Sequence, residues 1–178
     1  MTPDKNQKRE YSIQEYNPEW PKKFEEIKEI LKEVFSNKAL SIEHIGSTSI
    51  LGMKAKPLID VLVTVERVEP FTSEKEKMIS VGYEWGENYI APDTLIFYKT
   101  ERNRKTENIH VCIKNSFKAK QFIITRDYLR THPERAKLYG EIKDRLKKQF
   151  PNDYPAYRSG KQDFVDETER LAYAKIVT

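Results

Sequence analysis

The chain has 178 residues, of which 38% are apolar and 34% charged, and its 32 basic residues nearly balance 28 acidic ones to give a net charge of +4. This composition is typical of a soluble globule, so we expect residues 1–178 to form a single domain with a flexible segment at 1–10. A lone cysteine, Cys112, excludes an internal disulfide, and no apolar run of the sequence is long enough to span a membrane. Residues 1–10 lack the apolar core of a signal peptide, so we expect no such segment there. We expect a cytoplasmic protein without a membrane partner. The modest positive charge permits nucleic-acid binding but does not indicate it.

The N-terminal third of the sequence predicts one helix and three extended segments. Rough alternation over 11–16 favours a short edge strand. Asn17 and Pro18 form a helix start, with asparagine as N-cap and proline at the first helical position. Apolar residues then recur at helical spacing to about Ser36, and strands are predicted over 41–45 and 58–65.

The middle of the chain predicts a short helix followed by three strands. Ser73 and Glu76 have the spacing of a capping box, for a helix that ends at Gly82. Strands are expected over 83–89, 95–100 and 109–114, with a turn over 91–93. The charged stretch 101–107 is predicted to be a hairpin loop, and the alternative is that its cations guide an anionic substrate.

The C-terminal third, residues 116–178, is mostly helical in pattern. One helix follows Ser116 and is interrupted at 131–133, a second runs to Pro151, and a last helix follows Asp153. The chain is therefore predicted to belong to the α+β class, with a mixed sheet, flanking helices and a C-terminal helical group.

Asp60 is the main candidate for a functional residue, because it interrupts a nearly continuous apolar strand. A carboxylate there must be paired, or must face a cleft where it binds a cation. Earlier in the chain, Gly46 permits close approach of a ligand, and Ser47 and Thr48 can donate to phosphate oxygens. Asp60 would then hold Mg²⁺ that bridges those phosphates. The alternative is an ordinary Gly-Ser turn beside a hydrogen-bonded structural aspartate.

Further candidates flank this pair. His110 and Cys112 are predicted on one strand face, and their spacing excludes a structural zinc site. His110 would join Asp60 around one metal, or act with it as an acid–base pair. Glu43 is a substitute metal-binding acid near Asp60, or a partner of Lys56. For His44, a packed and hydrogen-bonded role is favoured.

Three cations are predicted to offset the negative charge of a phosphate. Lys56 would place an ammonium near phosphate as a point charge, and its alternative is a solvated side chain. Arg126 and Lys161 would reach the cleft from the C-terminal helices. The alternative for Arg126 is to anchor helix to sheet together with Asp127.

Several of these residues also carry a family resemblance. The segment 44–49 (HIGSTS), Gly52 and the segment 56–60 (KPLID) resemble the signature of the GrpB family, as do later segments at 108–111 and 126–134 and positions Tyr157, Lys161 and Phe164. The resemblance extends from about residue 16 to about residue 174. That family belongs to the polymerase-beta-like nucleotidyltransferase superfamily, and a related domain is fused to dephospho-CoA kinase in some bacteria.

The resemblance implies a nucleotidyltransferase-like fold and a nucleotide or another phosphate-containing ligand, with Mg²⁺ as cofactor. This sequence departs from the superfamily pattern, because Leu62 stands where the second strand acid is expected and no third carboxylate lies in 109–114. Two-metal phosphoryl transfer needs several converging carboxylates. A nucleotidyl-transferring enzyme therefore has two rivals: a non-catalytic nucleotide- or cofactor-binding module, and an accessory partner of a CoA-pathway enzyme.

Overall fold

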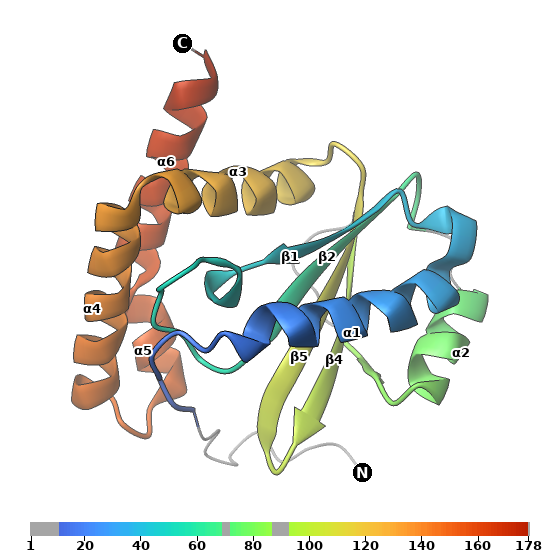
Figure 1. Cartoon of the computed structure of the whole chain (residues 1–178), viewed down its shortest axis with the longest axis horizontal. Coiled ribbons are helices and arrows are strands. Elements are labelled where there is room, and N and C mark those ends of the chain that lie inside the picture. The colour runs from blue at the N-terminus through green and yellow to red at the C-terminus, as the bar shows by residue number, and fades with distance from the viewer. Residues whose placement is uncertain (1–10, 69–71, 87–92, 178) are drawn as a thin grey trace.

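A computed structural model describes residues 11–68, 72–86 and 93–177. Within these ranges one mixed sheet has the strand order β1-β2-β5-β4-β3. Strands β2 and β5 pair in parallel and the other neighbours pair antiparallel. Helices flank this sheet, which confirms the α+β class (Figure 1). The strands are β1 (Ser41–Ile45), β2 (Ile59–Val65), β3 (Glu84–Trp85), β4 (Thr94–Glu101) and β5 (Arg104–Ile113).

One face of the sheet packs against α1 (Glu19–Phe35) and α2 (Thr72–Ser80). The apolar stripe of α1 meets alternate residues of the two central strands, including Val61, Val63 and Ile109, which are fully buried. Burial of this large apolar area is the main stabilising term of the fold.

The other face is covered by α3 (Phe117–Thr131), which packs on Ile45, Leu62 and Cys112. Since β2 is covered on both faces, its nearly continuous apolar sequence is explained. Helices α4 (Pro133–Gln149), α5 (Tyr154–Gly160) and α6 (Gln162–Val177) gather beyond one end of the sheet, on the side of the segment that joins β1 to β2 (Figure 1).

Two predicted features near the N-terminus differ in detail from the structure. Residues 11–16 contribute a single bridge, from Gln14 to Ala55, instead of a strand. Helix α1 begins at Glu19, whose N–H donates to Asn17 Oδ1, so Asn17 caps the helix from one position further out than predicted. The segment 1–10 lies outside the described residues.

The predicted capping box is wrong, and the hairpin predicted at 101–107 is present but has a much shorter loop than expected. Helix α2 already includes Ser73, whose hydroxyl donates to Glu74 instead of capping the helix with Glu76. The segment 101–107 is mostly strand, because β4 and β5 meet at a two-residue turn over Arg102 and Asn103 with φ of 46° and 62°. Two left-handed residues match the twist of a hairpin, so the ladder continues almost to the turn.

Two further boundaries were misjudged. The strand predicted over 83–89 is limited to Glu84–Trp85 within the described residues, and 87–89 and the turn at 91–92 lie outside them. The last helix breaks at Lys161 into α5 and α6. Gly160 precedes the break and packs so closely on α4 that a Cβ there would lie 2.6 Å from Leu146 Cδ2. No helix among the described residues has the length and apolarity needed to cross a bilayer.

Candidate functional site

The site is built around a contact between a tight turn and a strand. Gly46 follows β1 and precedes a single 3-10 turn, η2 (Ser47–Ser49). Its φ is +70°, and a Cβ at this position would lie 2.6 Å from Asp60 Oδ2. Glycine is therefore required at position 46 for two reasons: the backbone is left-handed there, and the Asp60 carboxylate occupies the space of a side chain.

The neighbouring strand β5 holds the Asp60 carboxylate in place. Asn108 lies beside Asp60 in the parallel pair and its Nδ2 donates to Asp60 Oδ1 at 2.9 Å, while His110 Nε2 is 3.7 Å from the same oxygen. Burial would raise the pKa of Asp60, but His110, Asn108 and the Lys56 charge outweigh it and hold the pKa below its ordinary value. Asp60 is thus an ionised carboxylate at neutral pH.

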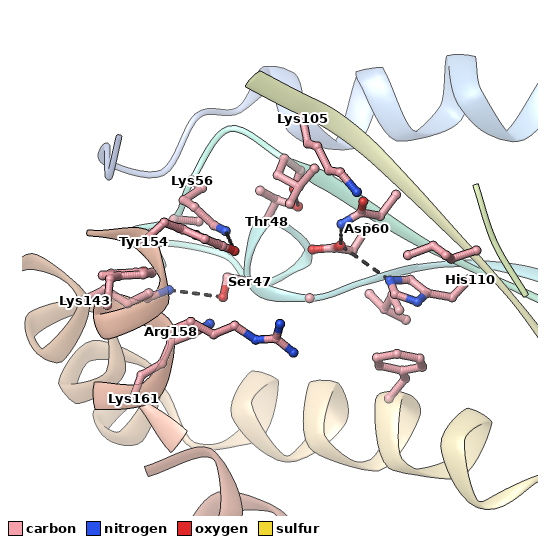
Figure 2. Close-up of a pocket in the computed structure, with 18 residues that line it drawn as sticks. Ser47, Thr48, Lys56, Asp60, Lys105, His110, Lys143, Tyr154, Arg158 and Lys161 are labelled. Atoms are coloured by element: carbon pink, nitrogen blue, oxygen red, sulfur yellow. Dashed lines mark hydrogen bonds and ion pairs between the residues drawn. The ribbon is translucent and has the colours of Figure 1, made fainter. Parts of the chain in front are cut away.

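A cavity of about 380 Å³, here called the lysine cavity, opens beside this carboxylate. Among its lining residues Asp60 is the sole acid, whereas five are cations that come from the sheet, the loop before β2 and the C-terminal helices. Figure 2 shows them around Ser47 and Asp60. These cations are Lys56, Lys105, Lys143, Arg158 and Lys161.

Lys143 is the most deeply buried of these cations. Only 2% of the residue is exposed, and its amine donates to Ser47 Oγ at 3.1 Å and lies 4.3 Å from the centre of the Tyr139 ring. Burial, followed by the charges of Lys161 and Lys56, lowers the pKa of Lys143 well below its ordinary value. An anion in the cavity would offset both effects and favour the charged ammonium.

Most of the predicted site residues meet in the lysine cavity. Gly46, Ser47, Thr48, Lys56, Asp60, His110 and Lys161 all line it. The Thr48 hydroxyl is engaged within the fold, however, since it donates to the Leu58 carbonyl at 3.1 Å and lies 3.0 Å from His44 Nε2. Lys56 is also held in place, because its amine donates to Tyr154 Oη at 2.7 Å (Figure 2).

Glu43 and Arg126 are engaged with each other instead of with the lysine cavity. Arg126 Nη1 is 2.6 Å from Glu43 Oε2, and Arg126 Nε is 2.7 Å from Asp127 Oδ1. This geometry matches the anchoring alternative for Arg126 and leaves Glu43 outside the residues that line the cavity.

His44 faces the opposite side of the sheet, where its ring stacks on Phe24 with centroids 4.9 Å apart. Burial lowers the pKa of His44 to about 4. The packed, hydrogen-bonded role predicted for this histidine matches the structure.

The residues around Asp60 do not fit a two-metal centre. Leu62 is fully buried beneath α3, and the neighbour of Asp60 on β5 is the amide of Asn108 instead of a third carboxylate. No group of three or more His, Cys, Asp or Glu side chains is placed to hold a metal ion within the described part of the chain. Electrostatic repulsion from the clustered cations also disfavours the binding of a second metal ion.

Three residues of the site were missed from the sequence: Asn108, Lys143 and Arg158. Lys105 also lines the cavity, and it belongs to the charged stretch 101–107, whose cations were the alternative for guiding an anionic substrate. For two of the missed residues, the sequence periodicity could have indicated a place in the site. Lys143 stands four residues after Tyr139 on the apolar stripe of its helix, and Asn108 stands two before His110 on the same strand face. Arg158 is an exposed charged residue, and its sequence neighbours do not single it out.

Comparison with known proteins identifies relatives whose sequences are similar to most of this chain. The chain is 37% identical over 166 residues to the UPF0157 protein YqkA of Bacillus subtilis, which covers 93% of this chain and 48% of that relative. The matched region is thus about half of YqkA. Dephospho-CoA kinase of Mycolicibacterium paratuberculosis is 25% identical over 183 residues, which cover 88% of this chain and 44% of the kinase.

Solved structures show the same fold. The crystal structure of conserved protein GrpB from Enterococcus faecalis superposes with a TM-score of 0.88 at 30% identity, over 94% of this chain and 100% of that one. A structure of Cid1 in complex with its short product ApU gives a TM-score of 0.52 at 16% identity, over 76% of this chain and 43% of Cid1. The likeness to Cid1 concerns the fold alone. Since the family model for GrpB protein matches residues 10–170, the chain belongs to the GrpB family.

Proposed function

We propose that this chain binds a nucleotide or another phosphate-containing small molecule in the lysine cavity, and that it does so without a metal ion. The observation that carries the proposal is the convergence of five cations on the turn at 46–49, with Asp60 as the single acid among the lining residues. Phosphate charge is stabilised strongly by cations in a partly desolvated pocket.

Each side chain has a role that follows from its position. Lys143 and the hydroxyl of Ser47, already hydrogen-bonded to each other, contact one phosphate oxygen from the side of α4. Lys161 adds a point charge, and the exposed Arg158 can close on the phosphate with its planar fork of donors. Asp60 repels phosphate and so keeps the ligand against the lysines.

A calorimetric titration tests this proposal. Pyrophosphate and a panel of nucleoside di- and triphosphates are added to the protein in the presence of EDTA. We expect measurable binding, which Lys143→Met and Lys161→Met each weaken by about tenfold or more, because loss of one charge-assisted hydrogen bond costs about 1.5–3 kcal/mol.

The matched control is Lys23→Met, which removes an exposed lysine from α1, on the far side of the sheet. It should leave the affinity unchanged. Absence of binding by every phosphate compound, or equal losses in the control and the cavity variants, would contradict the proposal.

Nucleotidyl transfer is a second candidate function, favoured by the Cid1-like fold and by the ionised Asp60 beside the Gly-Ser turn. It requires Mg²⁺ or Mn²⁺, for which Asp60 would be the carboxylate ligand. This candidate predicts metal-dependent turnover of a nucleoside triphosphate that is lost in Asp60→Ala while the fold persists. Binding without turnover in either metal would leave the binding module as the function.

A further inference from the structure

Lys143 stands on the face of α4 where apolar residues are expected. The buried residues of this helix recur at helical spacing, and Lys143 is buried on the same face as Ala136, Tyr139 and Leu146. Its amine points to Ser47 on the wall of the lysine cavity (Figure 2). Lysine is almost never buried unless an acid is paired with it, so this position needs an explanation.

No carboxylate is paired with the Lys143 amine. Within the described part of the chain, the amine donates to Ser47 Oγ and lies over the Tyr139 ring, and it takes part in no ion pair. The adjacent acid, Asp144, binds Lys54 at 2.7 Å instead. The usual compensation for a buried ammonium is therefore missing.

Two other lysines act on the same amine. The positive charges of Lys161 and Lys56 repel a proton on Lys143, and burial acts in the same direction. Only the neutral amine has a free electron pair, and lysines that are desolvated or placed beside another cation are the ones that attack carbonyl carbon. The surroundings of Lys143 thus favour a nucleophilic amine.

The rest of the lysine cavity determines which compound this amine would meet. Lys56, Arg158 and Lys161 line the same cavity and attract anions. The Ser47 hydroxyl, with its oxygen 3.1 Å from the Lys143 nitrogen, is placed to pass protons. We infer that Lys143 is a nucleophile that forms an imine with a small anionic aldehyde or ketone held in the lysine cavity.

The reaction is balanced without a further reactant. The Lys143 nitrogen forms a bond to the carbonyl carbon, and the carbonyl oxygen takes both protons of the amine, one of them through the Ser47 hydroxyl, and leaves as water. Hydrolysis reverses the reaction, so the compound is held covalently but not permanently. A bound phosphate compound favours the charged ammonium and should therefore suppress imine formation.

Reductive trapping tests this inference. The wild-type protein is incubated at about pH 7 with cyanoborohydride and glyoxylate, an anionic aldehyde, and peptide mass spectrometry measures the rate of modification at each lysine. We expect Lys143 to react about tenfold or more faster than the exposed Lys23, since an ordinary lysine is neutral in only about one molecule in 2,500 at this pH. In urea-unfolded protein the two rates should agree within about twofold, because the difference comes from the fold.

A second aldehyde and two variants test the parts of the inference. The ratio of the Lys143 rate to the Lys23 rate should be several-fold larger with glyoxylate than with uncharged acetaldehyde. Lys161→Met removes a neighbouring cation and should lower this ratio. Lys137→Met, on the exposed side of the same helix, is the control and should leave it unchanged.

The inference is overturned if Lys143 in the folded protein reacts no faster than Lys23, or more slowly than Lys56 or Lys161. Equal ratios with the two aldehydes would overturn the anionic class assigned to the carbonyl compound. Pyrophosphate titration of the same protein separates the inference from the proposed function. Pyrophosphate binding without a reactive Lys143 overturns the inference alone, and a reactive Lys143 without binding of any phosphate compound overturns the proposed function alone.

Discussion

Asp60 and Gly46 are related by a close contact that requires glycine at position 46. The carboxylate occupies the space where any side chain at position 46 would begin, and Asn108 and His110 hold it from the neighbouring strand. A charged residue is tolerated in this buried strand because its hydrogen bonds are supplied by the fold.

The variants Gly46→Ala and Gly52→Ala form a matched test of this contact. Both glycines have left-handed backbone, with φ of +70° and +75°, but a Cβ at Gly52 has no heavy atom within 4 Å. Gly52→Ala should cost about 1 kcal/mol for the backbone alone. Gly46→Ala should cost at least about 1 kcal/mol more and should weaken pyrophosphate binding, as measured by denaturant unfolding and titration. Equal losses of stability would show that the Asp60 contact is unimportant.

Lys143 illustrates a conflict between binding and stability. Its pKa in the folded protein is far below the ordinary value of 10.5, so at neutral pH the unfolded chain holds this proton more readily and the lysine destabilises the fold. Lys143→Met should therefore raise the free energy of unfolding at about pH 7 by about 1 kcal/mol or more, while it weakens phosphate binding.

The sign of the pH dependence follows from the same pKa. The stabilisation by Lys143→Met should be largest below the lowered pKa of the folded state and should shrink as the pH rises toward about 10, where lysine in the unfolded chain also loses its proton. Urea unfolding of both proteins at about pH 7 and about pH 10 measures this. If Lys143→Met is less stable than the wild type at neutral pH, the inference that buried Lys143 destabilises the fold is contradicted.

At the scale of elements, α3 is fixed to β1 by Arg126, which binds Glu43, Asp127 and the His44 carbonyl. From the sequence, Arg126 has two possible roles: it binds phosphate in the cleft, or it anchors the helix to the sheet together with Asp127. A cation beside an acid on a helix is compatible with both roles. Only the register of β1, which puts Glu43 opposite Leu62 on the α3 face, distinguishes them.

We expect Arg126→Gln to lower stability by about 1–2 kcal/mol, since the partly exposed Glu43 remains partly solvated when left alone. A double-mutant cycle with Glu43→Gln should show a coupling free energy of about 0.5 kcal/mol or more. Pyrophosphate affinity should stay within about twofold of the wild type. A tenfold loss of affinity with unchanged stability would instead assign Arg126 to phosphate.

The elements that sequence patterns predicted best are those with long periodic signals. Helix α1 and strand β2 have clear apolar patterns that fix their type and nearly their bounds. The β4–β5 hairpin was misjudged because its charged residues resemble a loop, whereas two left-handed residues suffice to turn the chain. The break at Lys161 follows Gly160, which packs against Leu146 of α4, and this tertiary contact cannot be seen in the local sequence.

For the whole molecule, the cleft lies where the end of the sheet meets the C-terminal helices, and residues far apart in sequence line it. Gly46, Ser47 and Asp60 were predictable because their types are unusual in their local surroundings. Arg158 was not, since a charged residue on a charged chain becomes functional only through the tertiary arrangement.

The most direct test of the central claim is the midpoint of thermal unfolding with and without pyrophosphate, in EDTA and again in Mg²⁺. A ligand at about 100 times its dissociation constant stabilises the native state by about 2.7 kcal/mol, which corresponds to a rise of about 5–10 °C for a chain of this size. We predict this rise in EDTA for the wild type and for Lys23→Met, and a rise reduced to about half or less in Lys143→Met, whose affinity is about tenfold lower or weaker still. A rise that requires Mg²⁺, or no rise in either condition, would contradict metal-independent binding in the lysine cavity.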